Sequence, residues 1–135
     1  MKERVKRPVL GEGPAVGFLE QDDAGHIYRI MRDTPRHKEL KEKAKAFLLS
    51  KGYDDIVEEI YAGVEYGTFT YSSPAVVDVA ALKDEKIVAI VECGQTPEGK
   101  LRTLARHFDE VYHLPYSSEI KKVERVPVEY RWELP

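Results

Sequence analysis

Residues 76–94 read VVDVAALKDEKIVAIVECG, and this stretch decides the fold. Two apolar runs, 76–82 and 87–91, flank four charged residues, a pattern that predicts a hairpin of two strands buried on both faces. The first run contains Asp78, and the second is followed directly by Glu92. A charge in such a strand is costly unless it is paired or binds a metal. These two acids are therefore the first candidates for chemistry.

The register of this hairpin decides whether the two acids meet. Opposed residues in an antiparallel hairpin have a constant index sum, so a turn centred on Glu85 places Asp78 opposite Glu92, with Cβ atoms about 4.5–5.5 Å apart. Two such carboxylates repel unless they share a proton or a cation, and their hard oxygen atoms suit Mg²⁺ or Mn²⁺. The alternatives are a turn centred between Asp84 and Glu85, which separates the acids, or a structural role in which Asp78 caps a strand end or pairs with a helix lysine.

Two proline-containing signals predict the helices on either side of the hairpin. Thr34-Pro35 is an N-cap followed by proline at the first helical position, and Gly52 ends the apolar stripe that follows. Thr96-Pro97 repeats the same signal. The predicted elements are a hairpin over 15–33, helices over 35–51 and 97–108, strands over 56–65, 76–82, 87–91 and 111–114, and an edge strand in the tail 117–135.

These elements predict a single domain over residues 1–135. The core, residues 35–114, has the order α-β-β-β-α-β, which indicates a mixed central sheet flanked by helices and a parallel crossover between the last two core strands. The one cysteine, Cys93, excludes an internal disulfide framework and a multi-cysteine zinc site. The four histidines have no metal-ligand spacing. No apolar run reaches the roughly 20 residues of a membrane helix, and the charged N-terminus has no signal-peptide core, so we expect a cytoplasmic protein without a membrane partner.

The net charge of −3 hides an uneven distribution. Residues 1–51 hold 12 basic and 8 acidic side chains, which gives +4, whereas residues 52–135 hold 9 and 16, which gives −7. A basic region beside a carboxylate-rich one suits an enzyme that grips a polyanion and binds a divalent cation. Charge runs of this kind are also common on solvated helix faces.

The core order, with Asp78 on its second strand and Glu92 on its third, resembles the PD-(D/E)xK nuclease superfamily and its restriction endonuclease-like fold. Pro74 lies a few residues upstream of Asp78, and the resemblance covers roughly residues 35–114. The segment IVECGQTPEGKL is similar to small archaeal members, in which a Glu-Cys-Gly turn joins strand and helix. The resemblance implies that Asp78 and Glu92 form the metal site.

The sequence departs from this pattern at the catalytic lysine. The lysine of the family falls at position 94, which is Gly94 here. Some families of this fold supply it from the following helix, where Lys100 is the candidate, and Gln95 is a candidate for positioning water or a phosphate oxygen. Many members also have a glutamate on the first helix that faces the metal, for which we favour Glu39. Each of these residues also has a structural alternative. Lys100 could be an exposed helix lysine, Gln95 a helix-entry residue, and Glu39 a surface salt-bridge partner.

The resemblance implies metal-dependent hydrolysis of DNA phosphodiester bonds, with Mg²⁺ or Mn²⁺ as the cofactor. The basic residues of the first helix that would contact the DNA backbone are Arg36, Lys38, Lys41 and Lys45. A domain this small offers little surface for reading sequence, which favours a homodimer acting on duplex or branched DNA. If Lys100 does not replace the missing lysine, the alternative is a non-catalytic nucleic-acid-binding or assembly module that retains the nuclease fold. A third alternative is an unrelated α/β interaction protein whose strand carboxylates are structural.

Overall fold

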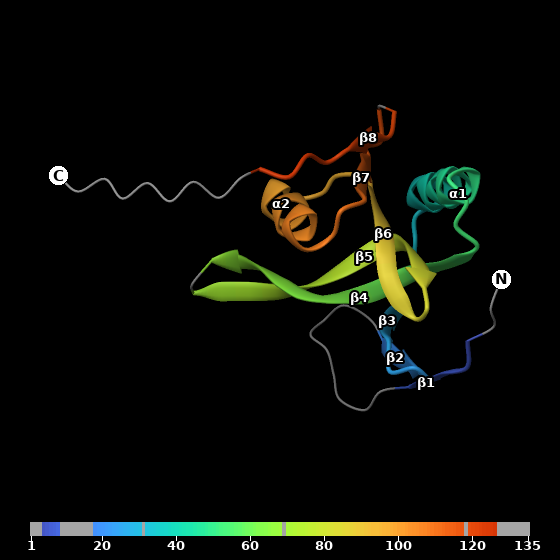
Figure 1. The fold of residues 1–135 in the computed structure, drawn as a ribbon. Helices are drawn as coiled ribbons and strands as arrows, with labels where there is room; N and C mark the ends of the chain where they lie inside the picture. Colours follow the sequence, from blue (N-terminus) through green and yellow to red (C-terminus); the bar gives the residue numbers. More distant parts are fainter. Residues whose placement is uncertain (1–3, 9–17, 31, 69, 118, 127–135) are drawn as a thin grey trace.

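The computed structural model describes residues 4–8, 18–30, 32–68, 70–117 and 119–126, which form one sheet of eight strands and two helices (Figure 1). The elements are β1 (Lys6–Pro8), β2 (Phe18–Asp22), β3 (Ile27–Ile30), α1 (Pro35–Ser50), β4 (Asp55–Thr68), β5 (Tyr71–Lys83), β6 (Lys86–Cys93), α2 (Glu98–His107), β7 (Val111–Leu114) and β8 (Lys121–Lys122). The strands lie in chain order, and every neighbouring pair is antiparallel except β6 and β7, which are parallel. The predicted mixed sheet and the order α-β-β-β-α-β are confirmed.

Helix α1 begins and ends at the predicted signals. The hydroxyl of Thr34 accepts a hydrogen bond from the N–H of His37 at 3.2 Å, and Pro35 is the first helical residue. Beyond the helix, Gly52 has a φ of +98°, a left-handed conformation that glycine adopts without strain. The apolar stripe of α1 packs on one face of the sheet, in a cluster that includes Leu40, Ala44, Leu48, Val79, Ala81, Ala89 and Val91.

Helix α2 covers the opposite face of the sheet (Figure 1). Leu104 packs there against the residues that alternate with those of the first cluster, namely Ala80, Leu82 and Ile90. This alternation is the period of two that a strand buried on both faces requires. Leu48 in α1 and Leu104 in α2 are fully buried, and each contributes about 2 kcal/mol to stability.

The β5–β6 hairpin turns through two residues, Asp84 and Glu85, with φ of 52° and 65°, the conformation of a type I′ turn. Of the two turn centres that the sequence left open, the structure has the one between Asp84 and Glu85. An irregularity then inserts one extra residue in β6 and shifts the pairing by one position. The pairs are Lys83 with Lys86 and Leu82 with Ile87 near the turn, then Ala81 with Ala89, Ala80 with Ile90 and Val79 with Val91. The next positions are Asp78 and Glu92, so the bulge restores the predicted pairing.

The terminal segments extend the sheet at both edges. The predicted hairpin over 15–33 is present as β2 and β3, whereas residues 15–17 and 31 lie outside the described residues. In the tail, β8 pairs antiparallel with β7, and most of the expected edge strand lies in residues 127–135, outside the described residues. In the described part of the chain, neither helix has the length and apolar character needed to cross a membrane.

Candidate active site

Four of the predicted site residues line one pocket between the two helices and the β5–β6 pair. This active-site pocket has a volume of about 340 Å³. Its lining residues are Arg29, His37, Asp78, Glu92, Cys93, Gln95, Thr96, Pro97, Lys100 and Tyr116. Residues from β3, α1, β5, β6, α2 and the segment after β7 therefore converge on the two strand carboxylates.

Asp78 and Glu92 bind each other's strand through their side chains. The N–H of Asp78 donates to Oε2 of Glu92 at 2.8 Å, and the N–H of Cys93 donates to Oδ2 of Asp78 at 2.7 Å. Both residues are buried, and Glu92 is fully so. These hydrogen bonds hold the two carboxylates side by side and leave Oδ1 of Asp78 and Oε1 of Glu92 for other partners.

Lys100 reaches this pair from the first turn of α2. Its ammonium group forms an ion pair with Oε1 of Glu92 and donates to the carbonyl oxygen of Val76 at 2.7 Å. Because the side chain is only 12% exposed, Lys100 is not a solvated helix lysine. The structure thus brings a lysine to the carboxylates from α2, although position 94 holds glycine.

Gly94 has no room for a side chain. Its φ is +77°, and a Cβ built on it would lie 2.8 Å from the ring of Tyr116. A lysine at this position would need both a left-handed backbone, which residues with a Cβ rarely adopt, and a displaced tyrosine ring. The absence of the family lysine at position 94 is therefore a property of the local packing.

His37 is a pocket residue that sequence reasoning missed. Its Nδ1 lies 3.0 Å from Oδ1 of Asp33, and its Nε2 lies 3.5 Å from Oδ1 of Asp78. The hydrogen bond to Asp78 and that to Asp33 outweigh burial and raise the pKa of His37 to about 9. The signal in the sequence is the Asp33–His37 spacing of four at the helix start, which places both side chains on one side of the N-cap.

The two strand carboxylates have unequal proton affinities. Burial and the neighbouring charge of Asp78 raise the pKa of Glu92. Burial alone would also raise the pKa of Asp78, but hydrogen bonds from His37 and from the N–H of Cys93 outweigh it and lower that pKa. The pair resists carrying two full negative charges, and a bound cation is one way to relieve that repulsion.

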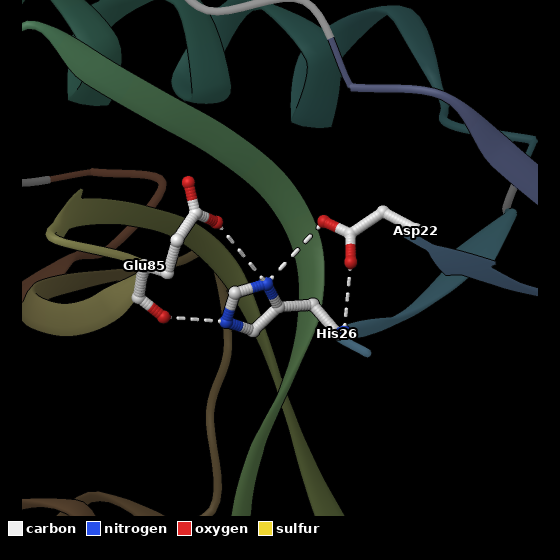
Figure 2. A group of neighbouring side chains, drawn as sticks. All are labelled: Asp22, His26 and Glu85. Atoms are coloured by element: carbon white, nitrogen blue, oxygen red, sulfur yellow. Dashed lines mark hydrogen bonds and ion pairs between the residues drawn. The ribbon is translucent and has the colours of Figure 1, made fainter. Parts of the chain in front are cut away.

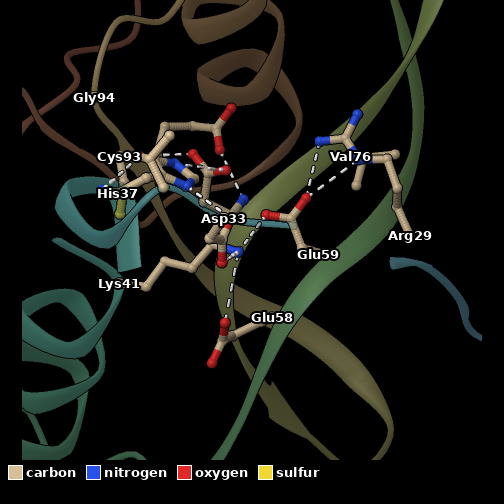
Figure 3. Close-up of polar contacts among 12 residues, drawn as sticks. Arg29, Asp33, His37, Lys41, Glu58, Glu59, Val76, Cys93 and Gly94 are labelled. Atoms are coloured by element: carbon tan, nitrogen blue, oxygen red, sulfur yellow. Dashed lines mark hydrogen bonds and ion pairs between the residues drawn. The ribbon is translucent and has the colours of Figure 1, made fainter. Parts of the chain in front are cut away.

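A third carboxylate, Glu59, stands beside Asp78 on the neighbouring strand. The flanking pairs Glu58 with Val79 and Ile60 with Val77 place it opposite Asp78. Glu59 has a φ of +53°, a strained conformation for a residue with a side chain. Two cations approach its carboxylate from opposite sides: Lys41 at 2.8 Å and Arg29 at 2.9 Å (Figure 3).

Lys41 is not accessible to a DNA phosphate, because its side chain is buried. It is 1% exposed, and its ammonium group also contacts Asp33 at 2.8 Å and Glu58 at 3.5 Å. These contacts raise the pKa of Lys41 despite its burial, which by itself would lower it. The predicted role of Lys41 in DNA binding is therefore wrong: the residue is the internal counter-ion of the carboxylates.

The remaining predicted residues of α1 are at the surface. Glu39 is exposed and does not line the active-site pocket, so the structure does not bring it to Asp78 and Glu92. His37 occupies the position beside Asp78 that was expected for a glutamate. Arg36 and Lys38 are exposed, whereas Lys45 is partly buried and pairs with Glu42 and Glu58. Of the four predicted backbone contacts, Arg36 and Lys38 remain available.

A second group of ligand-type side chains lies away from the pocket (Figure 2). One ligand atom each of Asp22, His26 and Glu85 lies within 4.8 Å of the other two. The guanidinium group of Arg4 already contacts Asp22 at 3.3 Å and Glu85 at 2.5 Å, and it also pairs with Asp55. Arg4 therefore supplies the positive charge that this group needs. We call these five residues the N-terminal cluster.

Asp78 and Glu92 fit a divalent cation better than the N-terminal cluster does. Oε1 of Glu92 is buried and, apart from its ion pair with Lys100, has no hydrogen bond. Asp78 lines the pocket, and its Oδ1 pairs with Nε2 of His37 at 3.5 Å. Mg²⁺ is commonly bound by one or two carboxylates together with water and substrate phosphate. Two carboxylate oxygen atoms beside a pocket match that requirement.

Comparisons of the chain with protein-family models, curated proteins and solved structures return no match. The features of the molecule that bear on its function are therefore those of the site: two opposed carboxylates and a lysine from α2, which line one pocket.

Proposed function

We propose that this protein is a metal-dependent nuclease that hydrolyses DNA phosphodiester bonds. The observation that carries the proposal is the arrangement in one pocket of Asp78 and Glu92, opposed on adjacent strands, with Lys100 in contact with Glu92. This is the chemistry that phosphodiester hydrolysis needs: oxygen ligands for a hard cation and a fixed positive charge beside them.

The order of the elements supports the same proposal. Helix α1, the strands β4, β5 and β6, helix α2 and β7 follow the α-β-β-β-α-β order of the PD-(D/E)xK nucleases, with the two acids on the second and third of these strands. We therefore propose a restriction endonuclease-like fold for residues 35–114. The lysine of the pattern would have moved from position 94 to Lys100, because Tyr116 fills the space beside Gly94.

Each pocket residue has a role in this proposal. Asp78 and Glu92 would hold Mg²⁺ or Mn²⁺, which, when bound, activates water and polarises the scissile phosphate. Lys100 would stabilise the negative charge that builds on the phosphate. Gln95 is exposed at the pocket entrance and would orient water or a phosphate oxygen. His37 holds Asp78 in place through its contact with Oδ1.

The DNA backbone would approach over the start of α1. Arg36 and Lys38 are exposed there, one on each side of the pocket residue His37 in the sequence. Arg and Lys contacts to phosphate fix the position of a duplex without reading its sequence. Because phosphate contacts by Arg36 and Lys38 release counter-ions from the DNA, we expect the affinity for DNA to fall as salt rises.

The test is a cleavage assay on duplex and branched DNA with Mg²⁺ or Mn²⁺, comparing Lys100→Met with Arg102→Met. Arg102 lies on the same helix, is exposed, and pairs with Glu98 at the helix surface. We expect Lys100→Met to lower the cleavage rate by about 100-fold or more, since one electrostatic contact in a transition state contributes that much. Arg102→Met should cleave like the wild type. Equal rates for all three proteins would contradict the proposal.

A second candidate is a non-catalytic nucleic-acid-binding module that retains the fold. Its support is that both carboxylates already have cationic partners within the chain, His37 for Asp78 and Lys100 for Glu92. Such internal pairing stabilises a site without a metal. Binding of the DNA probes by the wild type without any cleavage in Mg²⁺ or Mn²⁺ would favour this candidate over the nuclease.

A further inference from the structure

At the rim of the active-site pocket, the guanidinium group of Arg36 lies over the ring of Tyr116, which lines the pocket. The guanidinium carbon of Arg36 lies 4.2 Å from the centroid of the Tyr116 ring. Arg36 comes from the first turn of α1, and Tyr116 from the segment after β7, so the pair joins two elements distant in the sequence. We call this pair the Tyr116–Arg36 shelf.

The backbone of Gly94 holds the inner edge of the shelf. A Cβ at this position would lie 2.8–3.0 Å from the Cε2, Cζ and Oη atoms of Tyr116, so the ring occupies the space of a side chain. The outer part remains open, since Tyr116 is 38% exposed and Arg36 is exposed as well. The result is an aromatic side chain with one edge against Gly94, Arg36 over its ring, and the remainder partly open to solvent.

The shelf borders the proposed reaction centre directly. Tyr116 lines the same pocket as Asp78, Glu92 and Lys100, and Gly94 follows Glu92 by two residues in the chain. A phosphate held at the two carboxylates would therefore have one of its neighbouring nucleosides at the pocket rim. The chemistry available there is an aromatic ring and a planar guanidinium group, both of which stack on nucleobases.

We propose that the Tyr116–Arg36 shelf binds the nucleobase next to the phosphate at Asp78 and Glu92. This inference rests on the proposed function and adds a base-binding subsite to it. Stacking on an aromatic side chain contributes about 1–3 kcal/mol per base and tolerates any base, because every base has a π face. The subsite therefore favours substrates with an unstacked or single-stranded nucleotide beside the scissile bond.

The same inference explains why position 94 is glycine. A lysine there would displace the ring of Tyr116, whereas Lys100 reaches Glu92 from α2 without entering that space. The site thereby keeps a cation beside the carboxylates and gains a stacking surface at the rim.

The test uses the full chain and a short single-stranded DNA that carries 2-aminopurine, whose fluorescence is quenched when the base stacks. Binding is measured with Ca²⁺, a hard cation that also takes carboxylate ligands. We expect quenching with the wild type and with Tyr116→Phe. Tyr116→Ala should lose the quenching and bind about 10-fold more weakly, the equivalent of about 1.4 kcal/mol. Tyr71→Ala is the matched control, because this tyrosine is 72% exposed on the β4–β5 ribbon and does not line the pocket.

Two further variants show whether a lost signal comes from the missing stacking surface or from unfolding of the protein. Tyr116→Leu keeps an apolar side chain without a π face, and it should lose the quenching while its thermal unfolding stays close to that of Tyr116→Phe. Gly94→Ala, which pushes the ring away, should behave like Tyr116→Ala. Retained quenching and affinity in Tyr116→Leu would overturn the inference, as would equal losses in Tyr116→Phe and Tyr116→Leu.

The outcomes separate the subsite from the nuclease activity. If the wild type quenches the probe through Tyr116 but cleaves no DNA, the base subsite stands and the proposed hydrolysis fails. If the wild type cleaves DNA and Tyr116→Leu leaves both quenching and the Michaelis constant unchanged, the hydrolysis stands and the subsite is overturned.

Discussion

The N-terminal cluster and the active-site carboxylates are built from the same kinds of residue but are neutralised differently. In the N-terminal cluster, the single guanidinium group of Arg4 contacts three carboxylates from β2, β4 and the β5–β6 turn. In the active site, Asp78 and Glu92 take separate cations from two helices, and Oε1 of Glu92 has no hydrogen bond. A planar guanidinium group matches several carboxylates at once, whereas an ammonium group is a point charge. Acidic residues in proximity therefore indicate a ligand site only where their internal partners leave oxygen atoms facing a pocket.

The largest expected difference between the two regions is in metal-dependent cleavage. Asp78→Asn should lower the cleavage rate by at least about 100-fold, or about 2.7 kcal/mol, because the cation loses a charged ligand. Asp22→Asn should leave the rate per folded molecule unchanged, since Arg4 and not a metal neutralises that carboxylate. Single-turnover cleavage, normalised to the folded fraction from circular dichroism, measures both. Equal losses in the two variants would remove the distinction between the regions.

A smaller effect is expected for Lys41, the buried lysine of α1 that pairs with Glu59 and Asp33. Lys41→Met should lower the free energy of unfolding by about 2 kcal/mol, because it leaves Glu59 and Asp33 buried without their ammonium partner. Lys38→Met, on the exposed side of the same helix, should change stability by less than about 0.5 kcal/mol. Urea unfolding of both variants measures the difference. A stability loss in Lys38→Met as large as that in Lys41→Met would contradict the buried role of Lys41.

The smallest effect concerns the dependence of stability on acid pH. Burial would raise the pKa of Asp22, but the N–H of His26 and the hydroxyl of Tyr28 outweigh it and lower that pKa. The folded state therefore binds the proton less readily than the unfolded state. This contribution to stability is fully present above the unfolded pKa of about 4 and is lost as pH falls through the folded value.

In the Asp22→Asn variant, the free energy of unfolding should therefore decrease less than in the wild type as the pH falls from neutrality into the acid range. Urea unfolding at a series of pH values between neutrality and acid compares the variant with the wild type. Parallel curves for the two proteins would show that Asp22 does not couple to folding in this way.

Local signals predicted where both helices and the candidate acids lie, but the N-cap of α2 is Pro97 rather than the predicted Thr96, and no side chain caps that helix. The N-cap Thr34, Pro35 and Gly52 define α1 because capping and backbone preference act within a few residues. Asp78 and Glu92 stood out because charges rarely interrupt runs such as VVDVAAL and IVAIV. Their pairing was one of two registers that the sequence left open: the turn lies between Asp84 and Glu85, and a bulge in β6 then brings the two acids opposite each other. No local pattern in the sequence indicates that bulge.

Long-range contacts decided which charged residues serve the site. Lys41 belongs to a basic run that looks like a solvated face, yet it is buried because Glu59 and Asp33 approach it from other elements. His37 has no metal-ligand spacing in the sequence, but α1 carries it to Asp78 on β5. Glu39 is close to the apolar stripe in a helical projection, and the actual rotation of α1 leaves it exposed.

The sequence by itself determined the helices, the apolar strands and the two acids within them, because propensity, capping and hydrophobic period depend on neighbouring residues. Only the tertiary structure decided the bulge that opposes Asp78 and Glu92, the reach of Lys100 from α2 and the packing of Tyr116 over Gly94. These features depend on packing and ion pairing between residues that are far apart in the chain. No short stretch of sequence contains that information.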